Sequence, residues 1–181
     1  MKKEHVLPIV MLLTASIFTA CKDEEVPELT NDEELITTLT LTFEDDLTGA
    51  LSTFTFRDAD GPGGAAPTTF DTIRLTTGST YQLHISLLNE SVSPAEDLTT
   101  EVEDEGDAHQ LFYTVADADI TFAYADTDTN GDPVGLHMTA SAGSAGSGTV
   151  TVTLKHQPGT KDGNITTGET DVEITFVAEI E

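Results

Sequence analysis

The chain has 181 residues, about one domain's worth, and its 33 acidic and 7 basic residues give it a formal charge of −26. This charge excludes nucleic acid as a natural partner, because phosphate binding requires a patch of Lys and Arg, and it opposes electrostatic docking on anionic lipid. The single Cys excludes an internal disulfide framework. Thr occurs 31 times, and because this β-branched residue fits strands, the composition favours an all-β fold.

Residues 1–20 have the pattern of a lipoprotein signal peptide. Two Lys residues near the start precede an apolar stretch that runs from position 6 to position 20, and this stretch is shorter than the roughly 20 residues of a bilayer-spanning helix. The sequence FTAC, which ends at Cys21, resembles a lipobox, where signal peptidase II cleaves and the Cys is lipidated. We therefore expect a lipid anchor on Cys21; the alternative is an ordinary signal peptide followed by an unmodified Cys.

Residues 21–34 follow as an acidic, polar segment, and we expect this lipidated Cys and its neighbours to form a tether. The residues Lys22, Asp23, Glu24 and Glu25 resemble the surface-export signal of Bacteroidota lipoproteins. The resemblance implies a protein that is lipid-anchored in the outer membrane and faces the cell exterior. The alternative is a solvated tether that carries no export information.

Residues 35–181 show alternation of apolar and polar side chains at a period of two, which is typical of half-buried strands. We expect strands at 35–43, 52–57, 73–75, 81–87, 109–115, 120–124, 136–140, 150–154 and 172–178. About nine short strands separated by turns predict an all-β fold, an antiparallel, Ig-like β-sandwich. A closed barrel is the alternative.

Local signals suggest how neighbouring strands connect. The residues Thr77, Gly78 and Ser79 predict a hairpin between the third and fourth strands. A tight turn at 116–119 predicts that strands 109–115 and 120–124 pair with each other. Residues 94–97 predict the start of a short helical turn.

Catalytic motifs are lacking in the sequence. It contains no G-x-S-x-G turn, no H-E-x-x-H and no phosphate-binding P-loop. The single Cys is assigned to lipid, and the absence of Trp removes the usual platform for stacking on sugars. We therefore expect a protein that is not an enzyme.

An oxygen-rich loop is the first candidate metal site. Asp126, Asp128, Asn130 and Asp132 alternate along the chain beside a Gly, and hard cations such as Ca²⁺ take six to eight oxygen ligands in loops of this kind. The loop resembles the first half of an EF-hand, although His137 stands where the bidentate Glu of that motif would be. The sequence predicts a calcium site here; the alternative is a polar turn.

Two His residues form the second candidate site. His109 and His156 are in phase with the apolar residues of their strands and lie at strand ends near a carboxylate-rich segment. Imidazole suits zinc and copper, so the pair predicts a nitrogen and oxygen metal site; the alternative is that each caps a sheet edge. His84 and His137 are out of phase with the apolar residues, and we expect them on the solvated face.

Several stretches resemble those of small acidic surface lipoproteins of Bacteroidota: residues 56–61 (FRDADG), 86–90 (SLLNE), 105–110 (EGDAHQ), 124–128 (YADTD) and 168–171 (GETD). Some relatives carry the label of a type 1 periplasmic binding fold, which implies a two-domain α/β clamp that the strand pattern contradicts. Similar lipoproteins often accompany TonB-dependent outer-membrane receptors.

The resemblance implies a role in metal or nutrient acquisition. We expect a surface-anchored lipoprotein that binds a ligand or partner alongside such a receptor. The alternative function is a structural or adhesive module of the cell surface whose loops are stiffened by calcium.

Overall fold

The computed structural model describes residues 34–181. The expected signal peptide, Cys21 and the proposed export residues Lys22, Asp23, Glu24 and Glu25 lie outside the described residues, as does His5. Residues 34–181 contain all the other candidate site residues.

These residues form mostly strands, with one short helix. The elements are β1 (Thr38–Asp45), β2 (Leu51–Arg57), β3 (Thr69–Phe70), β4 (Ile73–Leu75), β5 (Thr80–Asn89), β6 (Glu96–Asp97), α1 (Leu98–Asp104), β7 (His109–Ala116), β8 (Ile120–Tyr124), β9 (His137–Ala142), β10 (Gly146–His156) and β11 (Glu169–Ile180).

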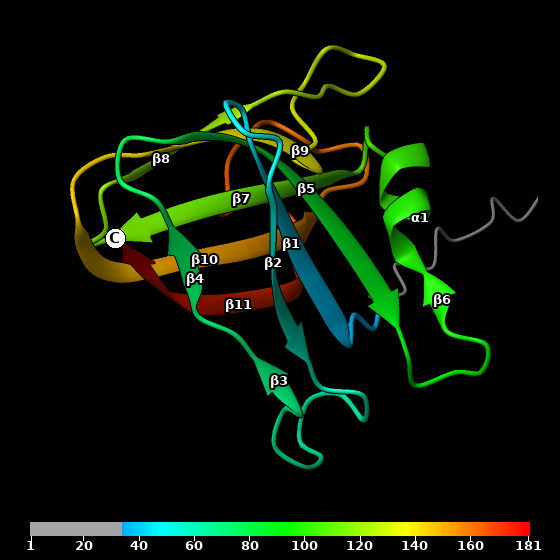
Figure 1. Ribbon diagram of the computed structural model, residues 1–181. Coiled ribbons are helices and arrows are strands. Elements are labelled where there is room, and N and C mark those ends of the chain that lie inside the picture. Colours follow the sequence, from blue (N-terminus) through cyan, green and yellow to red (C-terminus); the bar gives the residue numbers. More distant parts are fainter. Residues whose placement is uncertain (1–33) are drawn as a thin grey trace, which may run out of the picture. The chain divides into compact units, whose positions relative to one another are not determined.

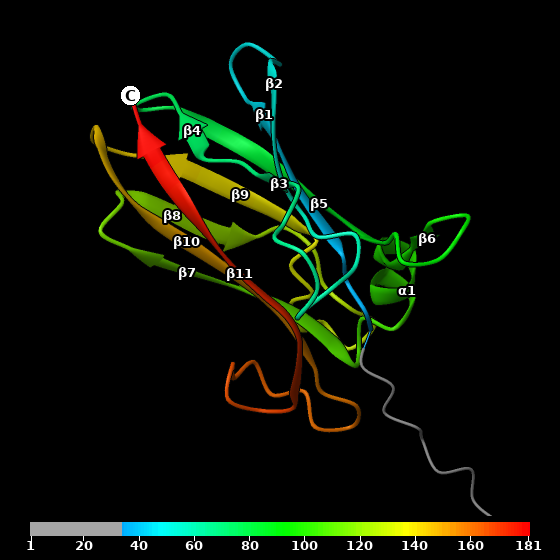
Figure 2. The same ribbon diagram turned by 90° about the horizontal axis from the view of Figure 1, so that it is seen from below.

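The strands are arranged in two separate sheets (Figure 1). One has the order β3-β2-β1-β5-β9-β8, with β6 paired to β5, and the other has the order β4-β11-β10-β7. All pairings are antiparallel except that of β4 with β11, which is parallel. Figure 2 shows the strands from below, with β1, β5 and β9 in one sheet and β7, β10 and β11 in the other. The expected all-β class is therefore confirmed, as two open, mainly antiparallel sheets consistent with a β-sandwich.

The core lies between the sheets and follows the period-two pattern. Along β11 buried and exposed side chains alternate, whereas in the second half of β10 Thr153 and Lys155 are buried as well. The buried set includes Leu39, Leu41, Phe43, Leu83, Leu87, Met138, Val150, Val152, Leu154, Ile174, Phe176 and Ala178. Burial of this apolar surface is the main term that stabilises the fold.

Two expected pairings are wrong. β4 does not form a hairpin with β5 but pairs with β11 in the other sheet, so the turn at Thr77, Gly78 and Ser79 crosses between layers. Likewise β7 pairs with β10, and β8 pairs with β9. The alternation of side chains indicates which face of a strand is buried, but a strand's hydrogen-bonding partner is not encoded in that alternation. A short connection can therefore join strands of different sheets.

The helix α1 begins later than the expected turn at 94–97. Glu96 and Asp97 pair with β5 as the strand β6, and the Asp97 carboxylate then accepts a hydrogen bond from Thr99 N as the N-cap of α1. Leu98 and Val102 are buried, which holds the helix against the core. In the described part of the chain no helix has the length and apolar character required to cross a bilayer.

Candidate metal centre

His109 and His156 face each other across two strands. His109 is the first residue of β7 and His156 the last of β10, and the register of the two antiparallel strands places them directly opposite. Both are in phase with the core residues Leu111 and Leu154, so both are buried. Their rings stack in parallel, with centroids 4.5 Å apart and an angle of 6° between planes. The sequence prediction that these two residues lie together is consistent with this geometry.

Two carboxylates complete the cluster. Glu34 precedes β1, and its Oε1 lies 3.2 Å from His109 Nε2. Glu105 caps the C-terminal end of α1. One ligand atom from each of Glu34, Glu105, His109 and His156 lies within 4.8 Å of the others. Two imidazoles and two carboxylates are a donor set that zinc and copper accept in proteins.

Both ring nitrogens of His109 face acceptors. Nδ1 lies 3.2 Å from the Glu105 carbonyl oxygen, and because a carbonyl only accepts, Nδ1 carries the proton and donates. Nε2 faces the Glu34 carboxylate, which when ionised also only accepts. The space between Nε2 and Glu34 therefore favours a positive charge, either the second proton of an imidazolium or a metal ion bound to the Nε2 lone pair.

The ionisation of this pair follows from its surroundings. Burial lowers the pKa of His109, but the hydrogen bond and the charge of Glu34, with the Glu105 carbonyl, outweigh it and raise the pKa above 6.5. Burial raises the pKa of Glu34, while the hydrogen bond and the charge of His109 outweigh it and lower the pKa below 4.5. Both pKa shifts mean that the pair favours its charged forms, with a positive charge on His109 beside an ionised Glu34.

Two polar atoms of the cluster are buried without a close hydrogen-bond donor or acceptor: Glu34 Oε2 and His156 Nδ1. The Asp171 side chain interacts with the Glu34 carboxyl and adds a further acidic group beside the cluster. Each buried polar atom left without a partner costs about 1–3 kcal/mol, so such atoms in a folded protein call for an explanation. Coordination of one metal ion would satisfy both atoms at once.

The loop 157–168 holds the backbone of His156 in place. Gln157 N donates to the Ala108 carbonyl at 2.6 Å, and its side-chain amide donates to the carbonyls of Asn164 and Thr167. Gly168 has a φ of +73°, and a Cβ there would lie 2.1 Å from the His156 carbonyl oxygen. The close approach requires Gly at this position.

The oxygen-rich loop is folded around internal bonds. The two oxygens of Asp126 accept hydrogen bonds from Gly135 N and His137 N. Asp128 Oδ1 accepts from the backbone of Asn130 and Asp132, and its Oδ2 lies 2.9 Å from Lys161 Nζ. Most of the carboxylate oxygens that were expected to bind calcium therefore already accept hydrogen bonds or pair with an ammonium group.

Sequence reasoning missed the two carboxylates of the cluster. Glu34 was placed at the end of the tether, although the buried contact with His109 ties it to the domain. Glu105 was one of many acidic residues in its segment, and the position after a short helix was not foreseen. For Glu105 the available signal was its proximity in sequence to His109, and for Glu34, 75 positions away, the sequence offered none.

The chain matches no family model, no curated protein and no solved structure. Any assignment of function therefore starts from the residues described above.

Proposed function

We propose that the protein is a non-enzymatic metal-binding lipoprotein that holds one Zn²⁺ or Cu²⁺ ion on Glu34, Glu105, His109 and His156. The observation that carries the proposal is that ligand atoms of these four residues lie within 4.8 Å of one another, with the buried His156 Nδ1 left without a hydrogen-bond partner. A metal ion bound to His109 Nε2 would supply the positive charge that the facing Glu34 carboxylate favours. The same ion would be bound by His156 Nδ1 and by the Glu34 carboxylate.

Coordination requires a limited change in the two rings. Lone pairs of parallel stacked imidazoles run side by side, whereas two nitrogens that bind one ion at about 2.0–2.1 Å must point toward it. One ligand atom from each of the four residues already lies within 4.8 Å of the others, so the required movement is small. The His109 tautomer is already set for binding through Nε2, because Nδ1 donates to the Glu105 carbonyl.

The cellular setting is proposed from the sequence. A lipid on Cys21 and the export residues Lys22, Asp23, Glu24 and Glu25 would anchor the domain in the outer membrane, facing the cell exterior. There it would capture metal alongside a TonB-dependent receptor. The formal charge of −26 supports this role, because it raises the local concentration of cations around the domain.

The strand order supports an Ig-like fold for this module. In that fold strands B, E and D form one sheet and C, F and G the other. If β5 is taken as B, the orders β5-β9-β8 and β11-β10-β7 match these two sheets. A binding site at one end of such a sandwich is in keeping with how these modules present ligands, at the level of fold analogy.

The second candidate function is a structural or adhesive surface module whose loops calcium stiffens. It rests on the oxygen-rich loop that contains Asp126, Asp128, Asn130 and Asp132, and it requires Ca²⁺ to displace hydrogen bonds that already order this loop. It predicts binding of Ca²⁺ rather than of Zn²⁺ or Cu²⁺, so the two functions separate by metal preference.

Calorimetry tests the proposed function. Purified full-length protein in detergent, stripped with chelator and held in excess Mg²⁺ to occupy unspecific sites, is titrated with Zn²⁺. We expect one tight site that His156→Asn weakens at least about 100-fold, since even outer-shell partners of metal ligands contribute 10–100-fold. The matched control is His84→Asn, the same substitution at an exposed His of the other sheet, which should leave this tight site unchanged. Equal affinity of wild type and His156→Asn would refute the proposal.

X-ray absorption on the wild-type protein with one equivalent of Zn²⁺ is independent of any variant. We expect a first shell that contains two imidazole nitrogens and carboxylate oxygens. A shell of oxygens alone would overturn the assignment even if the His variants fail to fold.

A further inference from the structure

His84 and His137 form a second His pair, on the outer face of the other sheet. His84 on β5 and His137 on β9 are cross-strand partners, and both are exposed. Ile85 N donates to the Leu136 carbonyl, so the adjacent pair of His residues occupies a non-hydrogen-bonded position. Side chains approach most closely at such positions.

All four His residues of residues 34–181 therefore lie in two cross-strand pairs, one buried and one exposed. A strand with outward-facing polar residues accepts many side chains, and neither sheet geometry nor stability requires His opposite His. The stacked pair His109 and His156 belongs to the proposed buried site. The outer pair needs a separate explanation.

The contact between the outer rings is made by nitrogen atoms. Nδ1 of His84 lies 2.7 Å from Nδ1 of His137, and the rings are near perpendicular, at 78°, with centroids 4.8 Å apart. In the metal-free protein this contact is a hydrogen bond in which one Nδ1 donates and the other accepts. The two Nδ1 atoms, one on each ring, therefore face each other across a short gap.

That spacing nearly matches two ligands of one metal ion. Two nitrogens bound at about 2.0–2.1 Å with an angle of roughly 90–110° lie about 2.8–3.4 Å apart. The two rings need to separate by only a fraction of an ångström for an ion to replace the shared proton. Small rotations of two exposed side chains supply this movement.

The surroundings of the pair suit an exchangeable ion. Thr42 faces His84 from β1, and Gln82 and Thr139 are the next outward pair, so the register neighbours are uncharged. The Asp126 carboxylate accepts a hydrogen bond from His137 N, which brings a negative charge close to the ring. Solvent can fill the remaining coordination positions, because both rings are exposed.

We propose that His84 and His137 form a second metal site, which binds Cu²⁺ or Zn²⁺ through two imidazole nitrogens and water. Cu²⁺ is expected to bind more tightly than Zn²⁺, in line with the general order of stability for nitrogen ligands. The site holds its ion more weakly than the buried cluster, because it has fewer protein ligands. It does not depend on the function proposed for that cluster, since different residues in a different sheet form it.

The test uses full-length protein in detergent that carries His109→Asn and His156→Asn, so that the buried pair is absent. Titration with Cu²⁺ in excess Mg²⁺ is followed by electron paramagnetic resonance. We expect one saturable equivalent whose spectrum shows coupling to two nitrogens. His84→Asn or His137→Asn should each weaken it at least about tenfold, whereas Thr139→Val, on the same face, should leave it unchanged.

Three results would overturn the proposal: a Cu²⁺ signal that survives loss of both outer His residues, a signal with no nitrogen coupling, or a Cu²⁺-dependent dimer in which each chain supplies one ring. If the buried-site variant unfolds, the same Cu²⁺ titration is made on the wild-type protein and on the double variant His84→Asn, His137→Asn. The proposal then requires that the outer variant lose the second, weaker equivalent and keep the first. An outer variant that still binds the second equivalent, whether or not it keeps the first, would overturn the proposal.

Discussion

Lys161 and Asp128 form a buried ion pair: Lys161 Nζ lies 2.9 Å from Asp128 Oδ2, and the two side chains are only 4% and 1% exposed. Lys161 Nζ also donates to the Gly106 carbonyl at 2.7 Å. Burial raises the pKa of Asp128, but the hydrogen bonds from Lys161 and from the backbone of Asp132 and Asn130 outweigh this and lower it. An ammonium group thus stands beside Asp128, where a metal cation was expected.

Replacement of Lys161 by Met should destabilise the fold. Removal of one partner of a buried pair leaves an uncompensated charge, at a cost of about 3 kcal/mol, the lower end of the usual range, because the loop around Asp128 is otherwise exposed. Urea unfolding at pH 7 measures this change. The double variant Lys161→Met with Asp128→Leu removes the unpaired charge and should recover part of the loss. A single-variant effect below about 0.5 kcal/mol, the scale of surface changes, would contradict a buried pair.

Calcium should leave the thermal stability of the wild-type protein unchanged relative to Mg²⁺. The oxygens of Asp126 and Asp128 accept internal hydrogen bonds and pair with Lys161, so a Ca²⁺ ion would have to displace these partners. Differential scanning calorimetry with each ion measures the outcome. A saturable rise with Ca²⁺ that Asp128→Ala abolishes would instead favour the structural module as the function.

The period of two in the sequence was enough to predict the burial of several key side chains. It predicted His109 and His156 on the inner face and His84 and His137 on the outer face, because side chains alternate strictly along a strand. It did not predict that each His faces another His, since register depends on which strands pair. The predicted pairings of β4 with β5 and of β7 with β8 were wrong for the same reason.

Local sequence patterns could not predict the polar partners of His109 and Asp128. Glu34 and His109 are separated by 75 positions and Asp128 and Lys161 by 33. A run of Asp residues looks the same in sequence whether a metal ion or a distant Lys balances its charge. Only the three-dimensional arrangement distinguishes these cases.

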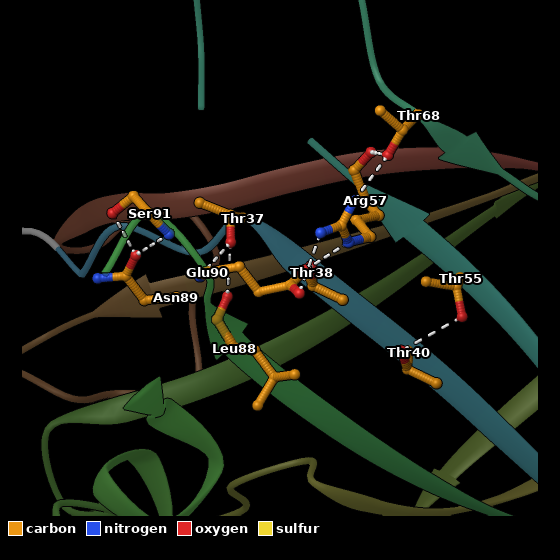
Figure 3. A network of polar contacts seen from close by, with 10 residues as sticks. All are labelled: Thr37, Thr38, Thr40, Thr55, Arg57, Thr68, Leu88, Asn89, Glu90 and Ser91. Carbon is orange, nitrogen blue, oxygen red and sulfur yellow. Dashed lines mark hydrogen bonds and ion pairs between the residues drawn. The ribbon is translucent and has the colours of Figure 1, made fainter. Parts of the chain in front are cut away.

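The ion pair between Arg57 and Glu90 should make stability depend on pH. Arg57 Nε and Nη2 donate to the two oxygens of Glu90 at 2.6 and 3.1 Å, and Thr38 also donates to Glu90 (Figure 3). The hydrogen bond from Arg57, with that from Thr38, lowers the pKa of Glu90 below 4.5. A carboxyl whose pKa is depressed on folding stabilises the protein above the unfolded-state pKa, and this contribution is lost as the pH falls through the folded-state pKa.

Arg57→Gln should therefore reduce stability at pH 7 and flatten the decline of stability below about pH 5. Urea midpoints measured from pH 7 to pH 3 test this expectation. The matched control is Arg74→Gln, because Arg74 and Glu179 form an ion pair in which both side chains are well exposed, at 52% and 43%, and exposed pairs contribute little. Identical pH profiles for Arg57→Gln and wild type would contradict the expectation.

Lipidation predicts that Cys21→Ala blocks processing by signal peptidase II and abolishes labelling with palmitate. A variant that still takes up label and fractionates with the outer membrane would show that the anchor is elsewhere. Replacement of Lys22, Asp23, Glu24 and Glu25 by Ala should keep the lipid but remove sensitivity to protease added outside intact cells. Unchanged sensitivity would refute the export signal while leaving the lipid anchor standing.

Gly168→Ala should both destabilise the fold and weaken Zn²⁺ binding. A residue with a side chain at a positive φ costs about 1–2 kcal/mol, and at Gly168 the new Cβ would also lie 2.1 Å from the His156 carbonyl, which forces the end of β10 to move. Gly159 provides a matched control, because its φ is +64° and nothing lies within 4 Å of a Cβ there. Gly159→Ala should therefore show the conformational cost alone and leave Zn²⁺ affinity unchanged. Equal Zn²⁺ affinities for the two variants would mean that the position of His156 does not control metal binding.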